Sequence, residues 1–270
     1  MKPFLKWAGN KYKIVERIQA LLPTGERLVE PFVGSGALFL NTDYPRYLLT
    51  DANADLINLY QHLQAEGEKF IDYCRPLFTP ENNDKDRYYA LRTEFNRTGD
   101  LRRKSALFLY MNKHGYNGLC RYNMKGGFNV PFGRYKRPYF PEAEMHHFAQ
   151  KAQSASFQHS SFTATMAACQ PGDVVYCDPP YVPLSSTANF TSYSANGFGW
   201  AEQTELARQA THLAQQGISV IISNHDTAEV RQVYQAAKIE SFEVRRFISC
   251  NGDRRENAAE LLALFKGKLT

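Results

Sequence analysis

Short apolar runs alternate with helical patterns in the first 64 residues. Runs of four or five mainly apolar residues are typical of buried strands, whereas apolar positions three and four residues apart predict helices. The first run leads into a glycine-rich turn at 31–36, and the second ends at Asp51. The predicted elements are a helix over 14–22, a strand over 27–30, a helix beginning near Ala37, a strand over 47–51 and a helix over 56–63.

The pattern changes between residues 65 and 145, where two helical stretches (88–96 and 102–112) precede a long loop rich in Gly, Asn and Tyr. Alternation then returns, with strands predicted over 173–177, 218–222, 242–248 and 260–265 and helices over 200–216 and 228–237, the last two strands able to pair antiparallel. The sequence therefore predicts an α/β protein with an open sheet. Residues 1–64 and 146–270 form the sheet domain, and residues 65–145 form an inserted, mainly helical lobe.

Composition places the chain among ordinary globular proteins. Its 270 residues with 43% apolar content can bury a full core as one large domain, or as one domain carrying an insertion. The N-terminus lacks the apolar run of a signal peptide, and no stretch approaches about 18 uninterrupted apolar residues. The cysteines are odd in number and show no metal-ligand spacing, which fits a reducing cytoplasm and no membrane association. They are Cys74, Cys120, Cys169, Cys177 and Cys250.

Positive charge is concentrated in one segment of the chain. Between Lys85 and Phe140 there are thirteen Lys and Arg against three acids, a balance of +10 in a chain whose net charge is +5. A charge run is often only a solvated face. Here nine aromatic residues lie among the charges between Phe108 and Phe140, and cations that bind phosphates together with aromatics that stack or wedge are typical of nucleic-acid binding. About half of those aromatics are expected in the core of the lobe.

Three motifs lie at the carboxyl ends of predicted strands, where open parallel sheets bind their ligands. The first is Phe32-x-Gly34-x-Gly36, whose glycines let the backbone turn sharply and approach a ligand, with the N-terminus of the following helix available to polar groups. The second is Asp51, placed to accept hydrogen bonds from ribose hydroxyls or simply to cap the next helix. Together they indicate a nucleoside cofactor, and no phosphate-binding loop of an NTPase is present.

The third motif, Asp178-Pro179-Pro180-Tyr181, is the most informative. Each proline lacks an N–H and restricts the residue before it, so the loop is stiff and rich in acceptors. The Asp178 carboxylate and the Pro179 carbonyl can accept both hydrogens of an exocyclic amine, which makes the nitrogen a usable nucleophile. Tyr181 offers a flat face on which an extruded base can stack.

Other catalytic signatures are missing or ambiguous. The chain has no GxSxG, no HExxH and no paired Cys/His ligands, so a hydrolase and a metal site lack support. His225, in Ser223-Asn224-His225-Asp226, is either catalytic or, as is more common, bonded within its loop. Cys177 is expected to be a small core residue.

Four blocks make the chain resemble the DNA adenine methyltransferase family, which modifies adenine in GATC. The likeness runs nearly end to end, from Phe4-Leu5-Lys6-Trp7-Ala8-Gly9 to the last strands, and the order of the motifs resembles the alpha arrangement of amino methyltransferases. The blocks are Glu30-Pro31-Phe32-Val33-Gly34-Ser35-Gly36, Gly115-Tyr116-Asn117-Gly118-Leu119-Cys120-Arg121-Tyr122-Asn123, Asn129-Val130-Pro131-Phe132-Gly133-Arg134-Tyr135 and Val175-Tyr176-Cys177-Asp178-Pro179-Pro180-Tyr181.

The resemblance implies a Rossmann-like sheet that binds S-adenosylmethionine, double-stranded DNA as partner, no metal, no obligate protein partner, and a bacterial or phage origin. Asp178, Pro179 and Tyr181 would be catalytic. The residues that would bind the cofactor are Trp7, Lys11, Glu30, Phe32, Gly34, Gly36, Asp51 and Asp178. In the lobe, Tyr116 would intercalate beside Asn117, while Lys6, Leu119, Arg121 and Pro131 would read base edges and Arg92, Asn123, Asn129 and Arg134 would hold phosphates.

One position departs from the family pattern, and two alternatives remain. Where the family usually has Gly-Gly-Lys, this chain has Gly9-Asn10-Lys11; asparagine tolerates positive φ, so the turn can survive. Cytosine-N4 methylation is the same chemistry on another amine, although such enzymes more often have Ser before Pro-Pro. A catalytically silent DNA-binding protein is the alternative from a different class, and the intact cofactor and acceptor loops argue against it.

Overall fold

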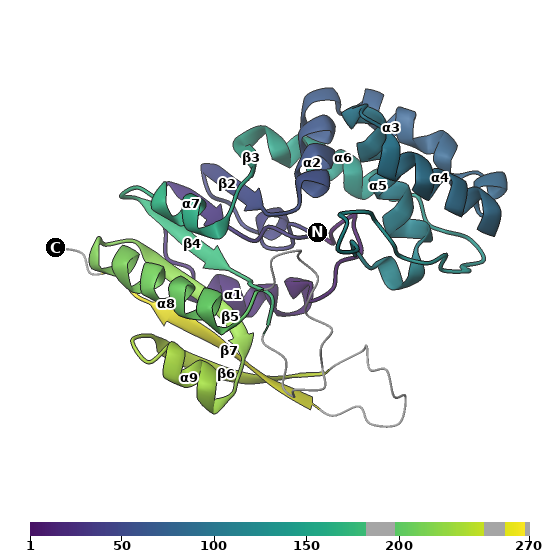
Figure 1. The fold of residues 1–270 in the computed structure, drawn as a ribbon. Coiled ribbons are helices and arrows are strands. Elements are labelled where there is room, and N and C mark those ends of the chain that lie inside the picture. The colour runs from purple at the N-terminus through teal and green to yellow at the C-terminus, as the bar shows by residue number, and fades with distance from the viewer. Residues whose placement is uncertain (182–197, 246–256, 268–270) are drawn as a thin grey trace.

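A seven-stranded mixed sheet forms the centre of the protein, in a computed structural model that describes residues 1–181, 198–245 and 257–267 (Figure 1). The strand order is β3-β2-β1-β4-β5-β7-β6. The strands are β1 (Arg27–Glu30), β2 (Arg46–Asp51), β3 (Ala155–His159), β4 (Asp173–Cys177), β5 (Ser219–His225), β6 (Lys238–Arg245) and β7 (Asn257–Phe265). The first five are parallel, and β7 runs antiparallel to both of its neighbours.

The direction of winding changes between β1 and β4, which lie side by side. From β1 the chain builds outward through β2 to β3, and from β4 it builds outward through β5 on the other side. A ligand site is expected beyond the carboxyl ends of the strands at such a reversal. The loops that follow Glu30 and Cys177 therefore meet there.

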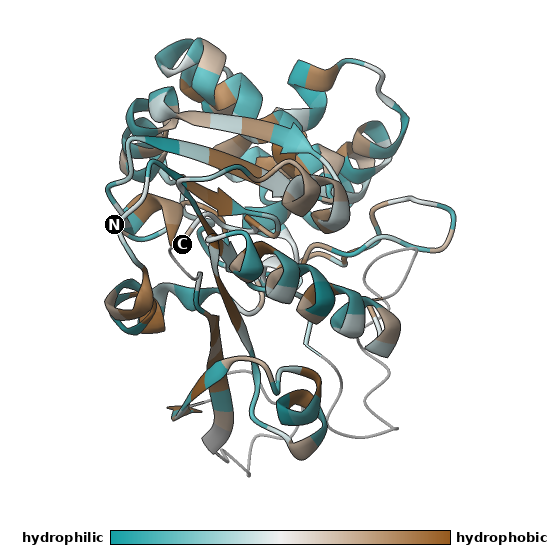
Figure 2. Ribbon diagram, turned by 90° about the vertical axis from the view of Figure 1, so that its left-hand side faces the viewer, coloured by the Kyte–Doolittle hydropathy of each residue, from teal (hydrophilic) through white to brown (hydrophobic). Residues whose placement is uncertain are grey.

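Helices cover both faces of the sheet (Figure 1). One face carries α7, α8 and α9 and packs Leu206 and Val230 against Val175 and Ile222. The other face carries α2 and α6. The α-helices are α1 (Val15–Leu21), α2 (Ala54–Glu66), α3 (Glu68–Cys74), α4 (Lys85–Arg97), α5 (Leu101–His114), α6 (Glu142–Lys151), α7 (Phe162–Ala167), α8 (Trp200–Gln215) and α9 (Ala228–Val233). Figure 2 shows hydrophobic residues concentrated along the strands, as burial on both faces requires.

The inserted lobe shares its core with one face of the sheet. Helices α3, α4 and α5 pack around Tyr88, Phe95 and Leu107, and this cluster is continuous with Leu49 and Phe157 of the sheet. Helix α2 lies between the two parts and packs against both α5 and β3. A continuous core of this kind holds the lobe rigidly on the sheet, while the division at residues 64 and 145 stays a prediction.

The α/β class, the antiparallel pairing of the last two strands and most elements are confirmed. Strands β1 and β4 have the predicted bounds, and β6 begins earlier than predicted, at Lys238, while the predicted part beyond residue 245 lies outside the described residues. Strand β3 was not predicted because it is an edge strand in which Phe157 alone is buried. A single buried position carries no periodic signal.

The helix predicted to begin near Ala37 is wrong, since only a 3-10 turn, η2 (Phe39–Asn41), forms there. The Asn41 amide donates to the Ala37 carbonyl at 2.7 Å, and the Thr42 hydroxyl donates to the Leu38 carbonyl at 3.0 Å. These side chains take the acceptors that a continuing helix would offer to its own backbone. The glycine loop is consequently followed by no long helix whose dipole could assist binding.

Two further findings concern the described residues alone. None of the helices there is long and apolar enough to cross a membrane. Cys74, Cys120, Cys169 and Cys177 are all free thiols, and Cys177 is buried in the core as predicted; Cys250 lies outside the described residues.

Candidate active site

The glycine loop after β1 is shaped for close approach of a ligand. Gly34 and Gly36 have φ of +47° and +69°, a region that favours glycine. A Cβ at Gly34 would lie 2.8 Å from Nε1 of Trp7, so the indole packs directly on the loop. The Gly34 amide donates to Oδ2 of Asp51 at 3.1 Å. Gly34 thus contacts both Trp7 and Asp51, which brings three of the predicted cofactor residues together.

Glu30 sits at the end of β1 with its carboxyl group buried. Oε1 has no hydrogen-bond partner among the residues that the structure describes, and burial raises the pKa of this carboxyl to about 8, well above the usual 4.5. A buried polar atom without a partner is costly unless a ligand completes it. The orphaned oxygen fits a site for a polar cofactor at this strand end.

Burial of Glu30 predicts an unusual dependence of stability on pH. The folded protein keeps this proton up to about pH 8, whereas the unfolded chain releases it near 4.5, so the free energy of unfolding falls as pH rises between these values and levels off above them. From about pH 6 to about pH 8.5, the free energy of unfolding of wild type should fall by roughly 2 kcal/mol more than that of Glu30→Gln, measured by urea unfolding. Parallel pH profiles of the two proteins would contradict this explanation.

Phe32 lies in an aromatic group on the far side of the loop. Its ring stacks on Phe162 with centroids 5.5 Å apart and meets Phe198 edge-on at 5.6 Å. The ring is half-buried, so it presents an apolar edge beside the glycines. That position suits its predicted part in shaping a pocket.

The Asp178 carboxylate is held by two donors on one of its oxygens. Lys11 Nζ lies 2.9 Å from Oδ1, and the Ser223 hydroxyl donates to the same oxygen at 2.9 Å. Burial by itself lowers the pKa of Lys11, but the charge of Asp178 and the hydrogen bond to it raise that pKa above its usual value, so the ammonium stays protonated. Within the described part of the chain, no donor reaches Oδ2. The carboxylate is therefore oriented with one oxygen available.

The two prolines of this loop differ in their contacts. The buried Gln203 amide donates to the Pro180 carbonyl at 3.1 Å and is itself fixed by Asn224 and Tyr234, which donate to its Oε1. The Pro179 carbonyl receives no donor from the residues that the structure describes. Two acceptors, Oδ2 of Asp178 and the Pro179 carbonyl, thus remain open on one stiff loop.

Tyr181 completes the loop with a fixed aromatic ring. Its hydroxyl donates to Glu260 at 3.3 Å, His225 meets the ring edge-on with centroids 4.6 Å apart, and Lys11 Nζ lies 4.6 Å from the ring centroid. The His225 ring thus packs against the Tyr181 ring, and its role stays a prediction. Sequence reasoning missed Ser223, Gln203 and Asn224. The polar run at 223–226, which follows the predicted strand over 218–222, was a signal for Ser223 and Asn224 but not for Gln203.

Asn10 does not adopt the positive φ that was invoked for it. Its φ is −50°, and Gly9 carries the positive φ of +75° instead. The Asn10 side chain accepts from the Tyr12 amide at 2.7 Å and donates to the Ser35 hydroxyl at 2.8 Å. Asn10 therefore fastens the segment that carries Lys11 onto the glycine loop.

Loss of this link should weaken cofactor binding. In Asn10→Gly the backbone is tolerated but the bond to Ser35 disappears, so the Kd for the cofactor that the sequence predicts, S-adenosylmethionine, should rise roughly three- to tenfold without DNA, measured by calorimetry. Ser35→Ala should give a similar rise in Kd. The Kd of the double variant should not exceed the higher of the two single-variant values, because both substitutions remove the same bond. A Kd equal to that of wild type would show that the link has no part in binding.

The predicted DNA-contacting residues lie in the lobe and in the N-terminal segment. Tyr116 is 51% exposed, in a turn held by the bond from its amide to the Pro131 carbonyl. Lys6 Nζ lies 4.0 Å from the Tyr135 ring centroid, and the Tyr135 hydroxyl accepts from the Asn117 amide. The structure thus brings the intercalation candidate and a base-reading candidate together.

The remaining candidates lie in a hairpin over 121–129 and beside it. Arg121 Nε donates to Oδ1 of Asn129 at 2.8 Å across the hairpin, and Oδ1 of Asn123 accepts two backbone amides at the tip. Arg92 donates to the Val130 carbonyl, whereas Arg134 is exposed at a φ of +53°. Asn123, Asn129 and Arg92 therefore have structural partners in addition to their predicted contacts. Leu119 is half-buried and Pro131 is exposed.

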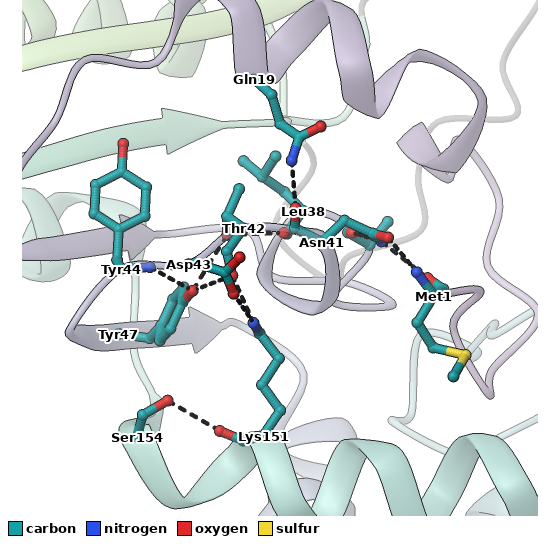
Figure 3. Close-up of polar contacts among 11 residues, drawn as sticks. Met1, Gln19, Leu38, Asn41, Thr42, Asp43, Tyr44, Tyr47, Lys151 and Ser154 are labelled. Carbon is teal, nitrogen blue, oxygen red and sulfur yellow. Dashed lines mark hydrogen bonds and ion pairs between the residues drawn. The ribbon is translucent and has the colours of Figure 1, made fainter.

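A hollow of about 280 Å³ lies at the opposite edge of the sheet, beside the residues that precede β1 and β2. Its polar groups bond within the protein, as with Gln19 to the Asn41 carbonyl and Lys151 to Asp43 (Figure 3). This hollow lies near the amino ends of β1 and β2, away from the carboxyl ends at which the three motifs lie. No cluster of His, Cys, Asp or Glu suited to a metal ion occurs among the described residues.

Comparison with known proteins gives consistent matches. The family model described as "D12 class N6 adenine-specific DNA methyltransferase" matches residues 7–248. The "DNA adenine methylase" of Salmonella typhimurium strain LT2 is 55% identical over 98% of this chain and 95% of that protein, and the "DNA adenine methylase" of Vibrio cholerae El Tor is 54% identical over 100% and 98%. A solved rRNA methyltransferase, aviRa from Streptomyces viridochromogenes, shows a TM-score of 0.38 at 12% identity over 96% of this chain and 87% of that one, which is too low to carry an argument.

Proposed function

The chain belongs to the D12 class of N6 adenine-specific DNA methyltransferases, and from that premise we propose that it transfers a methyl group from S-adenosylmethionine to N6 of an adenine flipped out of double-stranded DNA, within GATC. Its sheet is accordingly a Rossmann-like methyltransferase fold. The observation that carries the proposal is the pair of acceptors at the end of β4, Oδ2 of Asp178 and the Pro179 carbonyl, which no donor of the described residues reaches.

Two acceptors on consecutive residues of one loop match the two hydrogens of an exocyclic amine. When both N–H groups point at acceptors, the nitrogen lone pair is drawn out of conjugation with the ring and becomes available for attack. Lys11 and Ser223 hold the other carboxylate oxygen, so Asp178 is aligned before the base arrives. The carboxylate also stabilises the positive charge that develops on nitrogen as the methyl group is transferred.

The methyl donor supplies an electrophilic methyl group on a sulfonium, and the protein has to align nitrogen, methyl and sulfur while it excludes water. No covalent bond to the enzyme is needed. We assign donor binding to the predicted set, which is Trp7, Lys11, Glu30, Phe32, Gly34, Gly36, Asp51 and Asp178. Two observations support this assignment. Oε1 of Glu30 has no partner among the described residues, and the contact between Gly34 and Trp7 leaves no room for a Cβ at position 34.

The DNA surface follows from charge and exposure. An exposed Tyr116 on a fixed turn suits insertion into the gap that a flipped base leaves, beside Asn117. Lys6, Leu119, Arg121 and Pro131 are assigned to base edges, and Arg92, Asn123, Asn129 and Arg134 to phosphates. Tyr181, held by Glu260 and His225, offers its ring to the extruded adenine.

The base that accepts the methyl group tests the proposal. Duplex DNA is incubated with wild type and labelled S-adenosylmethionine, digested, and its nucleosides identified by mass spectrometry. N6-methyladenine is the expected product. N4-methylcytosine would overturn the choice of base in favour of the related reaction, and the absence of any labelled nucleoside would overturn the proposed activity.

A further inference from the structure

The hairpin that carries Arg121 has one face toward solvent and one toward the protein. The Asn129 amide donates to the Arg121 carbonyl and the Asn123 amide to the Gly127 carbonyl, which fixes the hairpin register. Successive side chains of an extended strand point to opposite faces. Arg121 and Asn123 share the outer face, and Cys120 and Tyr122 share the inner one.

The inner face is bonded to the first turn of helix α2. The Tyr122 hydroxyl donates to Oδ2 of Asp55 at 2.7 Å, and Nδ2 of the Asn53 side chain donates to Sγ of Cys120 at 3.2 Å. Asp55 is only 11% exposed, and its other oxygen lies 2.9 Å from Nζ of Lys104. A hydrogen bond to a largely buried carboxylate is stronger than one between neutral groups.

The same turn of α2 is bonded to the cofactor edge of the sheet. The backbone amide of Asn53 donates to Oδ1 of Asp51 at 2.9 Å, and Oδ2 of Asp51 accepts from the Gly34 backbone amide. Oδ1 of Asn53 caps α2 by accepting from Leu56. A continuous set of bonds therefore runs from the glycine loop through Asp51 and Asn53 to the hairpin.

The second strand of the hairpin is fastened to a different helix. Asn96 of α4 donates to the Phe128 carbonyl at 3.0 Å and accepts from its amide at 2.8 Å. The Tyr122 ring also meets Phe128 edge-on. Losing the Tyr122 hydroxyl consequently loosens the strand that bears Arg121 without releasing the whole hairpin.

We propose that Tyr122 and Asp55 are positioning residues that set the register of the DNA-reading strand relative to the cofactor edge, so that discrimination by Arg121 depends on their hydrogen bond. The inference rests on the proposed function, in which Arg121 reads a base pair. Neither residue touches the reacting atoms. Their effect is therefore expected in site discrimination and not in the chemical step.

Tyr122→Phe tests this inference, because it removes one hydroxyl and keeps the ring. Tyr110→Phe is the matched control, since the Tyr110 hydroxyl donates to the Asn82 carbonyl within the same lobe. For each protein, kcat/KM is measured on a cognate duplex and on duplexes with one altered base pair, together with kcat and Tm. Tyr122→Phe should lower discrimination at one pair roughly five- to tenfold while kcat on the cognate duplex stays within about twofold.

If the Tyr122 hydroxyl only stabilises the fold, both variants should have a lower Tm, and the ratio of kcat/KM between cognate and altered duplexes should stay unchanged. If wild type discriminates and Tyr122→Phe does so equally, the inference is overturned while the proposed function stands. If wild type methylates no adenine, or methylates every duplex equally, the proposed function fails first, and that result is visible in the wild-type measurements alone.

Discussion

Replacing Asp178 with alanine should reduce methyl transfer by roughly a thousandfold or more, with the fold retained. The variant loses one of the two acceptors for N6, and it also leaves Lys11 Nζ beside an empty position where a cation can repel the developing charge on nitrogen. Transfer is measured with tritiated S-adenosylmethionine on duplex DNA, and folding by circular dichroism and Tm.

Two companion variants define the cause of that loss. Ser223→Ala removes one donor from Oδ1 and should cost only about tenfold, because Lys11 still orients the carboxylate. Asp226→Ala removes a carboxylate that pairs with Arg231 near the surface, and its activity should match that of wild type. Near-normal transfer by Asp178→Ala would disprove the acceptor role.

Substituting Arg121 by alanine should relax discrimination at one base pair by roughly 1–3 kcal/mol. Asn129 orients Arg121, because Nε of Arg121 donates to Oδ1 of Asn129 and Nη2 donates to the Asn129 backbone carbonyl. The other N–H groups of the guanidinium are left to face a base edge. The measurement compares kcat/KM on the cognate duplex with that on duplexes altered one pair at a time.

Arg134→Ala serves as the contrasting variant for the same assay. A residue that holds a phosphate should weaken binding to all duplexes about equally and reduce the salt dependence of binding. If Arg121→Ala behaves in this uniform way, Arg121 is a phosphate contact and the base reading belongs to other residues.

The sheet and its strand ends could be predicted because buried parallel strands appear as short apolar runs. Strands β1 and β4 have the predicted bounds, and with them the loops after Glu30 and Cys177 were located at the carboxyl edge. The meeting of those loops follows from the side-by-side pairing of β1 and β4, which only topology supplies. Strand β3 could not be predicted because it is an edge strand with one buried residue. The 3-10 turn near Ala37 could not be predicted because side-chain hydrogen bonds stop a longer helix there.

The supporting residues of the acceptor loop could not be predicted in the same way. Ser223 of β5 and Gln203 of α8 contact residues 178–180, and Asn224 of β5 contacts Gln203. All of these contacts join residues more than twenty positions apart in the sequence, so they depend on tertiary packing. Asn10 departs from the family pattern in the sequence, but its bond to Ser35 is evident only from the tertiary structure. The assignment of individual residues to cofactor and DNA stays a prediction, as do the site GATC, the cytoplasmic location and the lack of an obligate protein partner.

The most direct test of the central claim is the position of the transferred methyl group in DNA. Genomic DNA that lacks N6-methyladenine is incubated with wild type and S-adenosylmethionine, and methylation is mapped by methylation-aware sequencing, with Asp178→Ala as the parallel sample. We predict N6-methyladenine at the adenines of GATC with wild type and none with Asp178→Ala. Methylation of cytosine, methylation of adenines in unrelated contexts, or equal methylation by Asp178→Ala would contradict the account.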